Sequence, residues 1–297
     1  MNKIRKAVIP AAGFGTRFLP ATKAQPKEML PIVDKPVIQY VVEECVASGI
    51  TDIIIVTGWN KRAIEDHFDE PYELLQRLAS AGKQQEFAEI RSISQMANFI
   101  YVRQKGPYGT ATPVSNARNI IGDEPFAVVW GDEFMQSPIP RLKQIIDVYE
   151  EYGKPVVAGM RIHEREELSK YGIADIESVK DNVYKLKGLI EKPAPDQAPS
   201  SIATLGAYIL PPEIFPIIDS LKPAKNGEYY LADAINTLSK TQDVYLKELE
   251  NAVYYDCGNK LSYLIANIDL ALKRPDLAIG LEQHLKKIFE TKLITQK

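Results

Sequence analysis

A loop of small residues directly follows the short apolar run at residues 7–9. Its small members are Ala11, Ala12, Gly13 and Gly15. Backbone N–H groups of such a loop can approach an anionic phosphate closely, because no side chain blocks them. Arg17 and Lys27 come soon after the loop, and their positive charges could neutralise the phosphate. The segment therefore indicates a phosphate-binding site.

Two well-known phosphate loops do not match this segment. A Rossmann dinucleotide fingerprint needs a third glycine where Phe18 stands, and a Walker A loop needs Gly-Lys-Ser/Thr, which is absent. An ordinary turn would also account for a lone Gly-x-Gly. Thr16-Arg17 and, ten residues later, the run Pro26-Lys27-Glu28-Met29-Leu30-Pro31 argue against that interpretation.

Two aspartates, Asp132 and Asp256, each follow an apolar run. Ligand-binding groups in α/β sheets gather at the carboxyl ends of strands. Mg²⁺ usually takes one or two carboxylates together with phosphate oxygens and water. Two aspartates from distant strand ends would suffice for such a site. Taken alone, however, an aspartate in sequences of this kind more often caps a turn.

Short apolar runs alternate with amphipathic stretches through the first half of the chain. Expected strands cover residues 7–9, 53–56, 99–102, 126–130 and 156–158. Expected helices begin at Pro36 and cover 60–68, 113–121 and 141–151. This spacing predicts an α/β fold with a doubly wound, mostly parallel sheet.

The pattern changes after about residue 160. Expected strands at 173–176, 183–190 and 203–209 have no long helices between them, so they predict antiparallel strands added to the main sheet. Residues 228–240 and the last thirty residues read as helical, as does the apolar stripe Leu261, Leu264, Ile265, Ile268 and Leu272. No linker or repeat divides the chain, which favours one domain over 1–297.

Composition narrows the class of protein. The 297 residues include 36 Lys and Arg against 39 Asp and Glu, and a net charge of −3 argues against a general nucleic-acid binder. No apolar run reaches the roughly 18 residues of a membrane helix. The basic start at 2–6 precedes too short an apolar stretch for a signal peptide. Two cysteines form no disulfide framework. We therefore expect a cytoplasmic enzyme with neither a nucleic-acid nor a membrane partner.

The segment at 8–31 closely resembles the start of the bacterial UTP–glucose-1-phosphate uridylyltransferases, within the sugar-1-phosphate nucleotidyltransferase family. The likeness is dense through Asn60 and returns at Gly131-Asp132, Glu191-Lys192-Pro193 and residues 255–260. These segments come in the family's order, so the resemblance spans nearly the whole chain. It implies a Rossmann-like fold with an added sugar-binding region. The implied reaction converts UTP and glucose 1-phosphate to UDP-glucose and pyrophosphate, with Mg²⁺ as cofactor.

The resemblance also implies roles for individual residues. Arg17 and Lys27 would be catalytic, and Asp132 and Asp256 would hold the metal. Nucleotide contacts would come from Ala11, Ala12, Gly13, Gly15, Glu28, Gln104 and Gly109. Sugar-phosphate contacts would come from Gly172, Glu191 and Lys192. The implied division is a nucleotide-binding core at 1–160, a sugar-binding region at 161–260 and C-terminal helices at 261–297. Tails of this family often pack between subunits, which implies a dimer or tetramer, although the tail could also cover its own domain.

The chain departs from the family pattern at several positions. Gly109-Thr110-Ala111-Thr112-Pro113 stands where Gly-Leu-Gly-His-Ala is usual. The other departures are Glu133 for Asp, Ala207 for Arg and Tyr230 for Gln. Because of these departures, three alternatives stay open. The nucleotide substrate could be dTTP, the sugar substrate could be another hexose 1-phosphate, or the protein could be a non-catalytic paralogue. Two features argue against a nicotinamide oxidoreductase. Phe18 replaces the third glycine of the dinucleotide fingerprint, and Gly58-Trp59-Asn60 stands where an acidic residue would bind the ribose.

Overall fold

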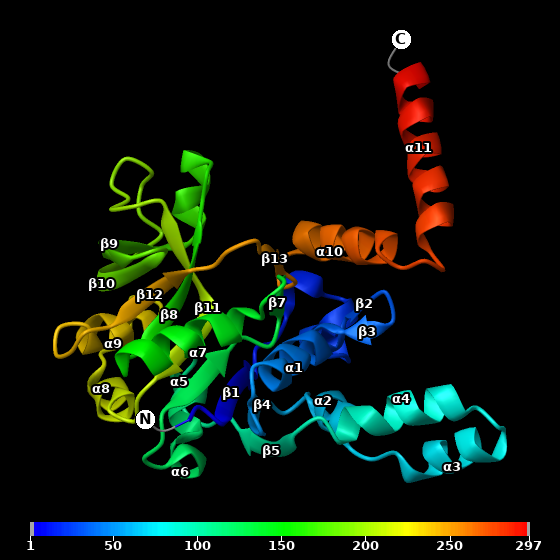
Figure 1. Ribbon diagram of the computed structural model, residues 1–297, viewed down its shortest axis with the longest axis horizontal. Helices are drawn as coiled ribbons and strands as arrows, with labels where there is room; N and C mark the ends of the chain where they lie inside the picture. The colour runs from blue at the N-terminus through cyan, green and yellow to red at the C-terminus, as the bar shows by residue number, and fades with distance from the viewer. Residues whose placement is uncertain (1–2, 296–297) are drawn as a thin grey trace.

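A nine-stranded mixed sheet runs through the computed structural model, which describes residues 3–295 (Figure 1). In spatial order its strands are β5 (Asn98–Arg103), β4 (Asp52–Thr57), β1 (Lys6–Ala11), β6 (Phe126–Val129), β11 (Ile202–Leu210), β8 (Val156–Arg161), β12 (Tyr245–Glu248), β10 (Val183–Glu191) and β9 (Gly172–Lys180). The first four strands are parallel to one another. Strand β11 is antiparallel to both of its main neighbours, β6 and β8, and β10 is antiparallel to β12 and β9. The predicted parallel core with added antiparallel strands is confirmed.

Helices cover both faces of the sheet, because successive residues of each central strand face opposite sides. Ile53 and Ile55 pack on one face with helices α1 (Val37–Ala47) and α7 (Arg141–Tyr152). Ile54 packs on the other face, which is covered by α5 (Ala111–Asn116), α8 (Ile214–Ser220) and α9 (Leu231–Leu238). Residues 53–56 are all fully buried, as a strand that is apolar on both sides requires.

Several elements differ from the prediction. The helix expected at 113–121 is two short helices, α5 and α6 (Arg118–Ile121), and residues 60–68 form α2 (Arg62–Phe68). The sequence suggested no element for 69–97, yet α3 (Tyr72–Ser80) and α4 (Gln84–Ser94) form a hairpin that extends from the body (Figure 1). Leu75 and Ile93 are the buried residues of this hairpin. So few apolar positions give too weak a stripe to be recognised from sequence.

Short 3₁₀ turns and two small two-stranded sheets complete the structure. These are the 3₁₀ turns η1 (Thr16–Phe18), η2 (Ala21–Lys23), η3 (Lys27–Met29) and η4 (Arg165–Lys170), the pair β2 (Pro31–Ile32) and β3 (Lys35–Pro36), and the pair β7 (Glu133–Gln136) and β13 (Val253–Asp256). Strand β13 thus belongs to a separate two-stranded sheet.

The C-terminal segment forms α10 (Lys260–Leu272) and α11 (Ala278–Thr295), and α11 projects away from the sheet (Figure 1). The last two residues of the predicted segment 261–297 lie outside the described residues. Within residues 3–295, no helix has both the length and the hydropathy that crossing a membrane requires.

Candidate active site

Three charged side chains approach Gly258, and a fourth is bonded to one of them. A Cβ at this position would lie 2.9 Å from Asp132 Oδ2, 3.0 Å from Asp256 Oδ1 and 3.8 Å from Arg17 Nη1, so a side chain there would crowd both carboxylates. The Lys27 ammonium donates a hydrogen bond to Asp132 Oδ2. The structure therefore brings together both predicted catalytic cations and both predicted metal ligands.

The pairing of β7 with β13 explains how two distant aspartates meet. Glu133, the first residue of β7, lies opposite Asp256, the last residue of β13. Asp132 directly precedes β7, and Asp256 Oδ1 accepts a hydrogen bond from Gly258 N at 2.9 Å. Asp132 follows β6, as expected, whereas Asp256 is itself the last residue of β13, a strand that lies outside the main sheet.

Burial and neighbouring charges shift the pKa values of Asp256 and Lys27 in this centre. Burial raises the pKa of Asp256, and the nearby Asp132 carboxylate raises it further. Burial alone would lower the pKa of Lys27, but the negative charges of Asp132, Glu28 and Asp256 outweigh it, so the pKa is raised. Lys27 therefore stays charged at neutral pH.

Two facing carboxylates fit a metal that takes most of its ligands from a substrate. Mg²⁺ is commonly bound through one or two carboxylates plus phosphate oxygens and water, and Asp132 and Asp256 supply that set. In the described part of the chain, no group of three or more His, Cys, Asp or Glu side chains forms a site that the protein alone could complete. The donor set thus matches a metal that arrives with phosphate.

The small-residue loop after β1 packs against Lys27. A Cβ at Gly13 would lie 3.8 Å from Lys27 Nζ, and one at Gly15 would lie 3.1 Å from Lys27 Cβ. The Thr22 hydroxyl donates to Gly15 O at 2.7 Å and fixes the curve of the loop. Ala11 is buried at the end of β1, and Ala12 follows it. The loop and Lys27 therefore border the same space.

Glu28 makes a buried ion pair that no sequence pattern indicated. Lys61 Nζ lies 2.7 Å from Glu28 Oε2, and each side chain is 1% exposed. Lys61 comes just after β4, and Glu28 Cγ also approaches Gly131 beside Asp132. The pair joins the turn that carries Lys27 to the ends of two central strands. A nucleotide contact from Glu28 stays a prediction.

Gln104 and Gly109 lie on the loop after β5. Gln104 N donates to Thr57 O at 2.9 Å, which places Gln104 beside the end of β4. Gly109 has φ of 129°, and a Cβ there would lie 2.2–2.8 Å from backbone atoms of Tyr229. Their predicted contacts with the nucleobase stay predictions.

The predicted sugar-phosphate residues lie together on β9 and β10. Glu191 is the register partner of Gly172, and a Cβ at Gly172 would lie 3.1 Å from Glu191 Oε2. Lys192 has φ of 46°, a left-handed conformation that lysine rarely adopts, and its N–H donates to Tyr171 O at 3.0 Å. Burial raises the pKa of Tyr171, and the charge of Glu167 raises it further. Gly172, Glu191 and Lys192 therefore form one group at the paired ends of β9 and β10.

A buried network around Arg141 supports the same centre. Arg141 is fully buried and bonds Glu44 at 3.1 and 3.2 Å and Glu133 at 2.8 Å. Glu133 also accepts from Gly206 N at 3.0 Å and from the Tyr254 hydroxyl at 2.6 Å. One of the departures from the family pattern is thus a residue that ties β7 to β11 and β13. Sequence alone showed Arg141 only as the start of an amphipathic helix.

Cys257 lies between Asp256 and Gly258 and is buried. Burial raises the pKa of its thiol, and the neighbouring carboxylates raise it further, which favours the protonated sulfur at neutral pH.

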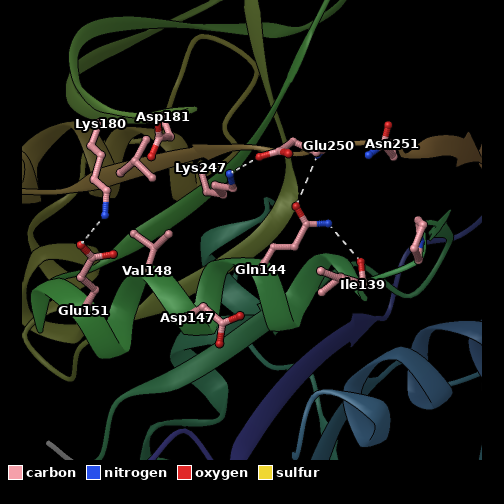
Figure 2. Close-up of a pocket in the computed structure, with 12 residues that line it drawn as sticks. Ile139, Gln144, Asp147, Val148, Glu151, Lys180, Asp181, Lys247, Glu250 and Asn251 are labelled. Carbon is pink, nitrogen blue, oxygen red and sulfur yellow. Dashed lines mark hydrogen bonds and ion pairs between the residues drawn. The ribbon is translucent and has the colours of Figure 1, made fainter.

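A well-formed pocket of about 330 Å³ lies elsewhere, between α7 and the segments that follow β9 and β12 (Figure 2). None of the predicted site residues lines it. Its lysines are paired with its own glutamates: Lys180 with Glu151 at 3.5 Å and Lys247 with Glu250 at 2.7 Å. The pocket therefore offers no converging catalytic groups.

Comparison with known proteins agrees with this geometry. The family model "Nucleotidyl transferase" matches residues 6–272. The UTP–glucose-1-phosphate uridylyltransferase YngB of Bacillus subtilis is 47% identical over 289 residues, which cover 97% of each protein. A UDP-glucose pyrophosphorylase complexed with UDP-glucose superposes with a TM-score of 0.83 at 41% identity, over 91% of this chain and 100% of that one. A UTP-bound UGPase from Acinetobacter baumannii gives 0.87 at 34% identity, over 95% and 98%.

Proposed function

The chain belongs to the nucleotidyl transferase family, and we propose that it converts UTP and glucose 1-phosphate to UDP-glucose and pyrophosphate. The observation that carries this proposal is that Arg17, Asp132 and Asp256 approach Gly258 and that Lys27 is bonded to Asp132. The relatives that share the fold are named for this reaction or for its nucleotide and product.

The reaction suits a site of charges rather than a site with a general base. The second pKa of a phosphate monoester is about 6, so the oxygen of glucose 1-phosphate is already ionised at neutral pH. That oxygen forms a bond to the α-phosphorus of UTP, and the bond to the bridging oxygen breaks, so that pyrophosphate leaves. The protein has to align the two phosphates and stabilise the developing charge. Arg17 and Lys27 supply that positive charge.

The other site residues divide into those that would bind the nucleotide, those that would bind the sugar phosphate and those that would hold the metal. Ala11, Ala12, Gly13 and Gly15 would place backbone groups around the UTP phosphates, with Gln104 and Gly109 at the base. Gly172, Glu191 and Lys192 would bind the sugar phosphate. Asp132 and Asp256 would hold Mg²⁺, which supplies further charge neutralisation at the phosphates. The proposed regions are 1–160 for the nucleotide, 161–260 for the sugar and 261–297 for the C-terminal helices.

We also propose a homo-oligomer held by the C-terminal helices. Leu261, Leu264 and Ile265 of α10 are exposed, as are Ile279 and Phe289 of α11. Helix α11 points away from its own sheet, so a second copy is the occupant that would cover these side chains (Figure 1). Light scattering after gel filtration should give a dimer or tetramer, and Leu264→Glu should reduce its mass. A monomeric wild-type protein contradicts this proposal.

The cytoplasmic location stays a prediction.

Product analysis tests the activity. The purified protein with Mg²⁺ is incubated with each of UTP, dTTP, ATP and GTP and with several hexose 1-phosphates, and pyrophosphate and nucleotide sugar are measured. We expect UTP with glucose 1-phosphate to give the highest kcat/KM. A clear preference for dTTP would make the protein a thymidylyltransferase, and tight binding without turnover would make it a non-catalytic paralogue.

A further inference from the structure

The end of β10 that leads to Glu191 has a strand partner on one edge only. Strand β9 pairs with β10 along its length, whereas β12 pairs only with residues 183–185. Leu186 N still donates to Val244 O at 2.8 Å. Beyond that bond, no strand among residues 3–295 pairs with this edge.

A side chain from α9 takes the place of the missing strand. Asn236 Oδ1 accepts from Leu189 N at 2.6 Å, and Asn236 Nδ2 donates to Leu189 O at 3.0 Å. One amide thereby satisfies both backbone groups of Leu189, as a neighbouring strand would. Leu189 is two residues before Glu191, so this contact fixes the backbone next to the sugar-phosphate residues.

The opposite end of α9 is bonded to the loop that carries Gln104 and Gly109. The Thr110 hydroxyl accepts from Leu231 N at 2.9 Å, which satisfies a free N–H in the first turn of the helix. Two backbone bonds join the same segments: Tyr229 N donates to Tyr108 O at 3.1 Å, and Ala111 N donates to Tyr229 O at 3.0 Å. Gly109 permits this contact, because a side chain there would overlap Tyr229.

We propose that α9 is a brace between the two substrate subsites, with Thr110 and Asn236 as the positioning residues at its ends. Glu191 and Lys192 need such support, because more than half of each side chain is exposed and burial does not hold them. Through α9, the loop beside the nucleobase sets the position of the strand end beside the sugar phosphate. This proposal rests on the proposed function for its substrates, but the contacts themselves do not depend on it.

The brace joins two of the departures from the family pattern. Thr110 stands where leucine is usual, and a leucine side chain cannot accept a hydrogen bond from Leu231 N. Tyr230, which stands where glutamine is common, immediately precedes α9. Its hydroxyl accepts from Asn226 at 2.7 Å.

The KM values for the two substrates distinguish a positioning role of α9 from a general loss of structure. Asn236→Ala and Asn236→Asp should raise the KM for glucose 1-phosphate about tenfold and the KM for UTP less than about twofold, since a carboxylate at 236 cannot donate to Leu189 O. Thr110→Val should raise the KM for glucose 1-phosphate about threefold, and Thr110→Ser should restore it. Thr237→Ala is the matched control, because its hydroxyl bonds only its own helix at Asp233 O and the residue is exposed.

Amide hydrogen exchange tests the brace whether or not the activity is as proposed. Exchange in residues 186–192 should be faster in Asn236→Ala and in Thr110→Val than in wild type, and unchanged in Thr237→Ala. If Asn236→Ala does not fold, the Thr110→Val and Thr110→Ser pair gives the same comparison. Exchange at 186–192 that is as slow in Thr110→Val as in Thr110→Ser and wild type overturns the brace. Equal rises in both KM values would also overturn it, whereas an inactive wild type would contradict only the proposed function.

Discussion

The proposed nucleotide side and the proposed sugar side of the site are held in place by different means. On the nucleotide side, Glu28 and Lys61 form an ion pair from which water is almost excluded, and Lys27 and Asp132 are about a fifth exposed. On the sugar side, the side chains of Glu191 and Lys192 are 60% and 62% exposed. Burial fixes the first group, whereas the second group carries only an exposed Lys192–Glu191 ion pair at 3.5 Å and is fixed by backbone contacts from β9 and α9.

This difference follows from what each side has to do. Charge stabilisation during phosphoryl transfer requires groups that do not reorganise as the reaction proceeds, and such groups act best in a site that excludes water. Recognition of a sugar phosphate requires access and a few correctly placed polar groups. We therefore expect changes on the nucleotide side to reduce turnover or stability, and changes on the sugar side to alter KM and selectivity.

The largest effect should come from the carboxylate pair. Asp132→Asn and Asp256→Asn keep the side-chain shape and remove one charge each, so each should lower kcat by about 10³-fold through lost metal binding. The double variant should be little worse than either single variant, because groups that act as one unit are not additive. Raising Mg²⁺ should partly rescue the weaker variant. Full activity of Asp256→Asn at limiting Mg²⁺ would leave Asp256 as a turn residue only.

The buried ion pair should govern stability. Lys61→Met leaves the Glu28 carboxylate buried without its partner and should lower the free energy of unfolding by about 3–5 kcal/mol. The double variant Lys61→Met/Glu28→Leu should regain most of that loss. Lys192→Met, on the exposed side, should change the same quantity by less than about 0.5 kcal/mol. Urea unfolding measures all three, and equal losses at Lys61 and Lys192 would contradict the contrast between the two sides.

A smaller and more selective effect is expected at Lys192. Lys192→Ala should raise the KM for glucose 1-phosphate about tenfold while the KM for UTP changes little, because a charged contact to the sugar phosphate is removed. Lys187→Ala is the control on the same strand, since its ammonium pairs with Glu177 at 2.6 Å. Steady-state kinetics with each substrate varied in turn make the comparison. Equal changes in both KM values would remove Lys192 from the sugar-phosphate site.

The smallest effect concerns the base. UTP and dTTP differ by one methyl group and one ribose hydroxyl, and pocket size alone discriminates a methyl by only about 1–3 kcal/mol. We expect UTP to be preferred with measurable use of dTTP, and purine nucleotides to be poor substrates. The ratio of kcat/KM values for the four nucleotides checks this, and a purine preference would show that Gln104 does not read the base.

The sequence predicted the parts of the fold that follow from local chemistry. Strands such as β4 are apolar on both faces, so their burial and parallel pairing could be anticipated. Hairpin α3–α4 buries too little apolar surface to leave a recognisable pattern. Within the site, Lys27, Asp132 and Asp256 belong to short motifs, and the structure brings them together.

Residues that act through tertiary contacts could not be predicted. Lys61 and Arg141 read as polar residues at helix starts, and only the fold shows that both are buried against carboxylates. Asn236 has no pattern of its own, because its role depends on a strand edge that is open at Leu189. Candidate catalytic and binding residues are therefore easier to predict from one sequence than the residues that position them.

The kcat of Lys27→Ala with both substrates saturating tests most directly whether the charged centre at Gly258 carries the chemistry. Lys27 joins the phosphate loop to Asp132, and its charge is needed most when charge builds up at phosphorus. We expect a folded protein whose kcat falls about 10²- to 10³-fold, with smaller changes in either KM. A kcat within about threefold of wild type would contradict a catalytic role for Lys27.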